Sequence, residues 1–119
     1  MGVTYRLFNH TKREELSFFR MWGSKLKELA GNPATASATT WYLLQNLGDQ
    51  IEFIADDWGA PPIGYEDVTD AVIRQLIDAG ILRDDGVCWQ DEDEPDLFIR
   101  ALTNVWMDGA PPGDRAPLG

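Results

Sequence analysis

Alternating apolar and polar positions near the start of the chain predict an antiparallel β-hairpin. Residues 3–9 alternate with a period of two, the polar residues after them are typical of a turn, and residues 14–19 are predicted to form the second strand. A short helix is predicted next, over residues 25–30. Ser24 is suited to the N-cap of this helix, and Gly31 to its end.

The longest uncharged stretch predicts a helix that leads into a strand. No charged side chain occurs between Glu28 and Asp49, although 25% of the chain is charged. Asn32 suits an N-cap, so a helix is expected over residues 33–47, followed by a strand over residues 50–56. Apolar residues point almost all the way round this helix, which is typical of a buried helix. Its one narrow polar stripe consists of Thr35, Thr39, Tyr42 and Asn46.

The second half of the chain predicts two further helices and a second hairpin. Residues 65–79 carry apolar side chains on one face at helical spacing, and Gly80 ends that pattern. Residues 81–90 are expected to form a hairpin in which an Asp-Gly pair supplies the turn. Residues 95–108 are expected to form the last helix, with Trp106 on its buried face.

Together these elements predict an α+β fold in which a small antiparallel sheet packs against about four helices. The sheet consists of the N-terminal hairpin and the strand 50–56, and the second hairpin, 81–90, is a candidate further part of it. A chain of 119 residues is expected to form one domain, here residues 1–109. The Pro/Gly-rich residues 110–119 are expected to be a flexible tail.

Several short motifs occur in the first half of the chain. They consist of Tyr5, Asn9, Lys12, Arg13, Glu14, Gly48, Asp49 and Ile51. Their pattern, Tyr-x-x-x-Asn, then x-x-Lys-Arg/Lys-Glu, and later Gly-Asp-x-Ile, resembles that of a family of small bacterial proteins to which no activity is assigned. The resemblance covers roughly residues 3–80. It implies the order hairpin, helix, strand, and it implies no biochemical role.

The composition bounds the class of protein. The single cysteine, Cys88, excludes an intrachain disulfide and a zinc site built from cysteines, and its short apolar strand predicts that it is buried. The N-terminus lacks the apolar core of a signal peptide. The uncharged stretch contains Pro33 and several hydroxyl side chains, which make it a poor membrane span. A cytoplasmic protein that does not bind membranes is therefore expected.

Charge is distributed unevenly along the chain. Residues 1–48 carry a net charge of +3, whereas residues 49–119 carry −13. Such asymmetry favours a surface that binds a basic partner, although acidic loops also keep a small protein soluble. The leading hypothesis is a small acidic module that docks on a basic protein and occludes it, as an immunity protein, an antitoxin or a nucleic-acid mimic would. The residues expected to bind the partner are Trp58, Asp84, Asp85, Trp89, Asp91, Glu92 and Asp93.

The alternative function is metal-dependent hydrolysis. Asp56 and Asp57 end a predicted strand and Glu66 lies just across a loop, an arrangement that commonly holds Mg²⁺. Roles for these carboxylates as turn and helix caps compete with this interpretation. The acidic run 91–96 lacks the glycine and the bidentate glutamate of an EF-hand, and no cofactor motif is present. His10, the only histidine, is interpreted as a surface residue of the first turn.

Direct binding to nucleic acid is not expected. Basic and aromatic residues do occur together over residues 12–27. The predicted helix 65–79 and the hairpin after it, however, would present aspartates to the phosphates and repel them.

Overall fold

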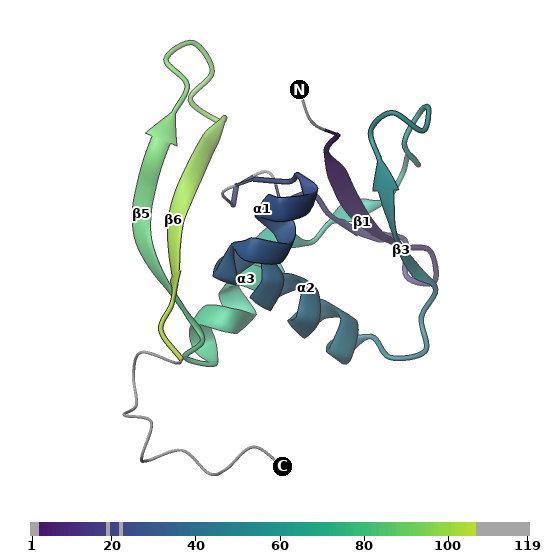
Figure 1. Cartoon of the computed structure of the whole chain (residues 1–119), viewed down its shortest axis with the longest axis horizontal. Helices are drawn as coiled ribbons and strands as arrows, with labels where there is room; N and C mark the ends of the chain where they lie inside the picture. Colours follow the sequence, from purple (N-terminus) through teal and green to yellow (C-terminus); the bar gives the residue numbers. More distant parts are fainter. Residues whose placement is uncertain (1–2, 19, 22, 107–119) are drawn as a thin grey trace.

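A four-stranded sheet, three helices and a two-stranded hairpin make up the part of the chain that the computed structural model describes, residues 3–18, 20–21 and 23–106 (Figure 1). The strands are β1 (Tyr5–Asn9), β2 (Glu14–Leu16), β3 (Ile51–Ala55), β4 (Glu66–Asp67), β5 (Leu82–Gln90) and β6 (Phe98–Asn104). The helices are α1 (Leu26–Gly31), α2 (Pro33–Gln45) and α3 (Thr69–Asp78). The predicted mixture of helices and small sheets is confirmed, with three helices in these ranges instead of about four.

The main sheet has the strand order β3-β1-β2-β4. β1 pairs antiparallel with both β2 and β3, which confirms the predicted N-terminal hairpin and the predicted strand after α2. β4 instead pairs parallel with β2, so the expectation of a wholly antiparallel sheet is wrong. In this register Leu7 lies opposite Leu16 on one side and Phe53 on the other.

The core lies between one face of this sheet and the three helices. β1 and β2 contribute Leu7 and Leu16, and Phe18 stacks on Phe53 with 6.2 Å between the ring centroids. All three helices and the start of β5 complete the core. Their buried members are Leu29, Ala34, Ala38, Tyr42, Val72, Ile73, Leu76 and Leu82.

The start of α1 is stabilised differently from the prediction. Lys25, not Ser24, is the N-cap residue, and its backbone N–H donates to Glu28 Oε1 over 3.2 Å. Ser24 instead accepts the backbone N–H of Tyr5 through its carbonyl oxygen. Gly23 makes room for the Glu28 side chain, because a Cβ at Gly23 would lie 2.6 Å from it.

α2 begins as predicted, but it buries only the side that carries its polar stripe. The Asn32 side chain accepts the Ala34 N–H over 2.9 Å, which confirms the N-cap. The expected burial on nearly all sides is wrong, however. The polar stripe faces the core, with Thr35 0% and Tyr42 4% exposed, while Leu44 is 63% exposed. Polar atoms can face a core when their hydrogen bonds are satisfied there, as those of Thr35 and Tyr42 are.

The C-terminal part differs most from the prediction. The helix expected over 65–79 begins only at Thr69, after β4. The hairpin expected over 81–90 is wrong, because these residues form the single strand β5. The helix expected over 95–108 is also wrong, because β6 pairs with β5 instead and Trp106 is 58% exposed. The predicted tail, residues 110–119, lies outside the described residues.

Two features of the sequence explain this difference. The Asp-Gly pair does not reverse the chain. Gly86, with φ of +98°, lies instead at a bulge where the register shifts between Asp84 and Val87. The helical spacing of apolar residues after Phe98 is equally compatible with a strand once a partner strand is present.

Candidate functional site

β5, the loop 91–97 and β6 form a hairpin that we call the arm. Figure 1 shows the arm standing beside the helices, on the opposite side from β1 and β3. Its root is attached to the body. Leu82 is 2% exposed, the Val105 N–H donates to the Ile81 carbonyl over 2.9 Å, and Asn104 Nδ2 donates to Ser37 Oγ over 2.9 Å. The root of the arm is therefore fixed on α2 and α3.

Arg20 provides a second attachment, partway along the arm. Its guanidinium lies 4.3 Å from the centroid of the Phe98 ring, and Nη1 lies 3.0 Å from Asp70 Oδ2 on α3. The Arg20 carbonyl also accepts the N–H of Arg100 over 2.9 Å. One residue of the body thus binds β6 through both its backbone and its side chain.

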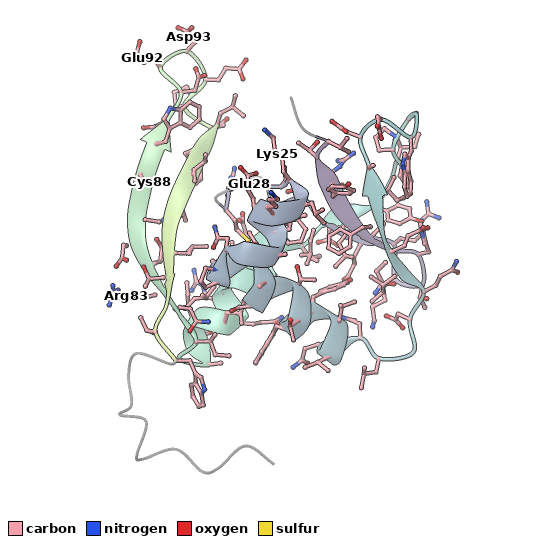
Figure 2. All side chains as sticks on the ribbon, viewed as in Figure 1. Lys25, Glu28, Arg83, Cys88, Glu92 and Asp93 are labelled. Atoms are coloured by element: carbon pink, nitrogen blue, oxygen red, sulfur yellow. The ribbon has the colours of Figure 1, made fainter. Side chains whose placement is uncertain are left out.

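The outer part of the arm exposes apolar side chains beside acidic ones. Val87 is 50% and Trp89 47% exposed, and Figure 2 shows Glu92 and Asp93 at the far end of the arm. Asp91 organises this end, because its Oδ1 accepts the N–H groups of Asp93 over 2.8 Å and of Glu94 over 3.0 Å. The carboxylates left exposed by this arrangement are those of Glu92, Asp93, Glu94 and Asp96.

Asp84 and Asp85 bind within the arm itself. Asp84 Oδ2 lies 2.9 Å from Arg100 Nη1, and Asp85 Oδ1 lies 2.7 Å from Arg83 Nε. Thr103 Oγ1 donates to Asp85 over 2.9 Å. The hydrogen bonds from Arg83 and then Thr103 lower the pKa of Asp85 below its usual value. These two carboxylates link β5 to β6, so their charges are compensated inside the arm.

Trp58 lies away from the arm. It belongs to the loop that follows β3, on the other side of the helices in Figure 1, and it is 68% exposed. The residues predicted to bind a partner therefore fall on two separate surfaces. Trp89, Asp91, Glu92 and Asp93 lie at the outer part of the arm, whereas Trp58 cannot join them on one contact surface.

The carboxylates of the predicted metal site are not brought together. Asp56 accepts the backbone N–H of Thr4 over 3.3 Å and its hydroxyl over 2.9 Å, so it ties the start of the chain to the end of β3. Across residues 3–18, 20–21 and 23–106, no group of three or more His, Cys, Asp or Glu side chains could hold a metal ion. Asp57 and Glu66 thus form no metal site with Asp56.

His10 has more partners than its position in a turn indicates. Its Nδ1 lies 2.7 Å from the Tyr65 hydroxyl and its Nε2 lies 2.6 Å from Glu52 Oε2, while the side chain is 22% exposed. A neutral ring satisfies both contacts if Nε2–H donates to Glu52 and Nδ1 accepts from Tyr65. No sequence motif could indicate this set, because its members are 42 and 55 positions from His10.

A cavity of about 640 Å³ opens on the face of the sheet that carries Arg6 and Phe8. Its charged lining residues already bind each other or their neighbours. Arg6 pairs with Glu15 over 3.1 Å, Arg20 pairs with Asp70, and Asp67 accepts the Ser17 hydroxyl over 2.8 Å. Burial raises the pKa of Glu15 above its ordinary value. A ligand would have to displace these pairs, so the cavity is a weaker candidate than the arm.

Several residues of the short motifs meet in one hydrogen-bonded network around Asn9, which is 0% exposed. Asn9 Nδ2 donates to the Tyr42 hydroxyl over 3.1 Å and to Asp49 Oδ2 over 2.8 Å. Tyr42 donates in turn to Glu14 Oε1 over 2.8 Å, and Lys12 Nζ lies 2.7 Å from Asp49. Burial raises the pKa of the Tyr42 phenol, so this hydroxyl remains a donor. The network joins the hairpin turn, α2 and the start of β3, which is a structural role.

Cys88, predicted to be buried, is exposed on β5 (Figure 2).

Within the described ranges, no helix combines the length and hydropathy that crossing a membrane requires. Comparison with protein families, with curated proteins and with solved structures finds no match to this chain.

Proposed function

We propose that this protein is a binding module that docks its arm on a basic protein partner and occludes the surface it covers. One observation carries the proposal. In the outer part of the arm, a half-exposed Trp89 stands near the end of β5, and the loop that follows exposes Glu92 and Asp93, which form no ion pair within the described residues. Tryptophan is enriched at protein-binding surfaces, and exposed charges around such an anchor steer a partner of opposite charge towards it.

Each part of the arm has a separate task in this proposal. The exposed carboxylates attract the basic partner and raise the rate of encounter. Trp89 then loses its contact with water against the partner, which slows dissociation. The internal pairs of Asp84 and Asp85 keep the two strands together, so these residues shape the arm and do not contact the partner.

The proposal revises the surface expected from sequence. Trp58 is left out, because the loop after β3 that carries it lies on the opposite side of the helices from the arm (Figure 1). Glu94 and Asp96 are added, because both are exposed in the loop that carries Glu92 and Asp93. The partner remains a basic protein, since the exposed charges at the end of the arm are all negative.

Differential capture from a lysate of the source cell tests the proposal. The immobilised wild type is compared with an arm variant that combines Trp89→Ala, Glu92→Lys and Asp93→Lys. A control variant carries the same kinds of change on other exposed positions, Trp58→Ala, Asp57→Lys and Asp78→Lys. We expect a basic protein, identified by mass spectrometry, to bind the wild type and the control variant and to be lost with the arm variant.

Circular dichroism of both variants must match the wild type, since all six positions are exposed. If no protein distinguishes the arm variant from the control variant, the arm is not the binding surface. Selective capture of acidic proteins by the arm would also contradict the proposal.

A further inference from the structure

A second groove lies between the sheet and the helices α1 and α2. It has a volume of about 390 Å³ and is lined by apolar and hydroxyl-bearing side chains, with no charged residue among them. The sheet contributes Tyr5 and Phe53, α1 contributes Leu26 and Leu29, and α2 contributes Ala36 and Thr39, among others. Such a lining fits an apolar side chain.

The strand that contributes Phe53 to the groove, β3, is an edge strand of the sheet. β3 is the terminal strand of the order β3-β1-β2-β4. The bonds Asp56 N–H to Thr4 and His10 N–H to Gln50 show which residues of β3 bond to β1. Hydrogen bonding alternates in an antiparallel pair, so the N–H and C=O groups of Ile51 and Phe53 point to the open edge. These groups are available to another strand.

The α2 side of the groove extends the apolar surface along that helix. Ala36, Thr40 and Leu43 follow one another at intervals of four and three positions, which places them along one side of the helix, and Leu47 follows in the turn after α2. Leu43 is 38% and Leu47 77% exposed. A segment lying along β3 therefore meets apolar side chains beyond the groove itself.

The α1 side of the groove carries two lysines, while the one acidic side chain of this helix, Glu28, is turned back onto the Lys25 N–H. Lys25 and Lys27 are both exposed, and between them Leu26 is 68% exposed. Neither lysine takes part in an ion pair within residues 3–18, 20–21 and 23–106. Lys25 extends into solvent at the end of α1 in Figure 2. These charges favour a carboxylate on whatever occupies the groove.

We infer that this groove binds an extended peptide segment of a partner protein, which adds to the edge of β3, inserts an apolar side chain and places an acidic residue near Lys25 and Lys27. Unpaired backbone groups on β3 require an extended occupant, since a helix has no free backbone groups with which to bond them. The uncharged lining requires the apolar side chain, and the two lysines select the acidic one. The charge preference is opposite to that of the arm, so the two surfaces bind different segments.

Selection from a displayed library of random octapeptides on the immobilised protein tests this inference. Enriched peptides are expected to alternate apolar and other residues and to carry Asp or Glu. A synthetic copy of the most enriched peptide, added to the protein, should slow amide hydrogen exchange at Ile51 and Phe53. An absence of enrichment, enrichment of basic peptides, or unchanged exchange at both amides would overturn the inference.

Variants then locate the peptide. Ala36→Leu, which fills the groove, and the pair Lys25→Glu with Lys27→Glu should each weaken binding of the synthetic peptide about tenfold or more. Arg74→Glu changes an exposed charge on α3 and should leave binding unchanged. If the lysine variant binds as well as the wild type, the assigned charge preference is wrong. The lysine positions are exposed, so the test with the lysine variant does not depend on whether Ala36→Leu folds.

Sedimentation of the protein without peptide addresses a different occupant. The inference expects a monomer whose groove is open. A dimer that Ala36→Leu converts to a monomer would assign the groove to a second copy of this chain and overturn the inference. The arm variant of the capture experiment should bind the peptide normally, so failure of one proposal is distinguishable from failure of the other.

Discussion

Tyr42→Phe should be strongly destabilising although it keeps the whole aromatic ring. The hydroxyl accepts from Asn9 Nδ2 and donates to Glu14 Oε1, with Tyr42 4% and Asn9 0% exposed. Phenylalanine removes a hydrogen bond to a charged acceptor and leaves one N–H of the buried Asn9 amide without its partner. An unpaired buried group costs about 1–3 kcal/mol and a charged hydrogen bond about 1.5–3 kcal/mol. Because Glu14 can regain water, we expect a net loss of about 2–3 kcal/mol.

Urea denaturation followed by tryptophan fluorescence measures this loss, provided that the slope of the transition is unchanged. Tyr5→Phe is the matched control, because the Tyr5 hydroxyl has no hydrogen-bond partner among the described residues and its loss should cost under about 0.5 kcal/mol. If Tyr42→Phe also costs under about 0.5 kcal/mol, the network does not hold the hairpin turn to α2.

Three further predictions concern the loss of stability at low pH, the bulge at Gly86 and the attachment of the arm by Arg20. Hydrogen bonding from Lys12 lowers the pKa of Asp49 in the folded protein. Its carboxylate therefore stabilises the fold at pH values above the ordinary aspartate pKa of about 3.9. This contribution is lost as the pH falls through the lower folded-state pKa. Asp49→Asn should therefore flatten the decline of melting temperature in that acid range, and an unchanged decline would count against the pairing. Gly86→Ala should lower the free energy of unfolding, measured by thermal melts, by about 1 kcal/mol or more, because φ is +98° at this bulge. Gly31→Ala is the control and should be neutral or stabilising, because its new Cβ would meet no atom within 4 Å. Equal effects of the two substitutions would refute the bulge. Arg20→Gln removes a cation–π contact with Phe98 that is worth about 0.5–2 kcal/mol. It should therefore raise the rate of amide hydrogen exchange in β6 relative to β1 by about 2–30-fold. If exchange in β6 does not rise selectively, Arg20 does not hold the arm.

The sequence predicted the N-terminal half of the fold well because its signals there are local. Polar turn residues, the Asn32 cap and the period-two strands each act within a few positions, and β1, β2, α2 and β3 all lie where they were expected. The orientation of α2 could not be predicted, because apolar residues lie on most of its sides. What decides it is the hydrogen bonding of Tyr42 to Asn9 and Glu14, which are 33 and 28 positions away.

The amphipathic pattern of α3 did predict a helix, but the chain after α3 was predicted poorly because its structure depends on long-range pairing. β6 contains apolar residues at both helical and strand spacings, and only its pairing with β5 selects the strand. Once β6 is a strand, Asp84 and Asp85 lie beside Arg100 and Thr103 and cease to be free charges. The acidic end of the arm did follow from sequence, because its exposed carboxylates depend only on a polar loop.

The association rate of the captured partner, measured by surface plasmon resonance over a range of salt concentrations, tests the proposed function most directly. The Debye length falls from about 10 Å at 0.1 M to about 3 Å at 1 M ionic strength, so steering by exposed charges should fade over that range. The wild type should associate more slowly as salt rises, and Glu92→Lys with Asp93→Lys should slow association further at low salt. Trp89→Ala should leave association unchanged and speed dissociation. An association rate that neither salt nor the charge reversal alters would contradict docking by the arm.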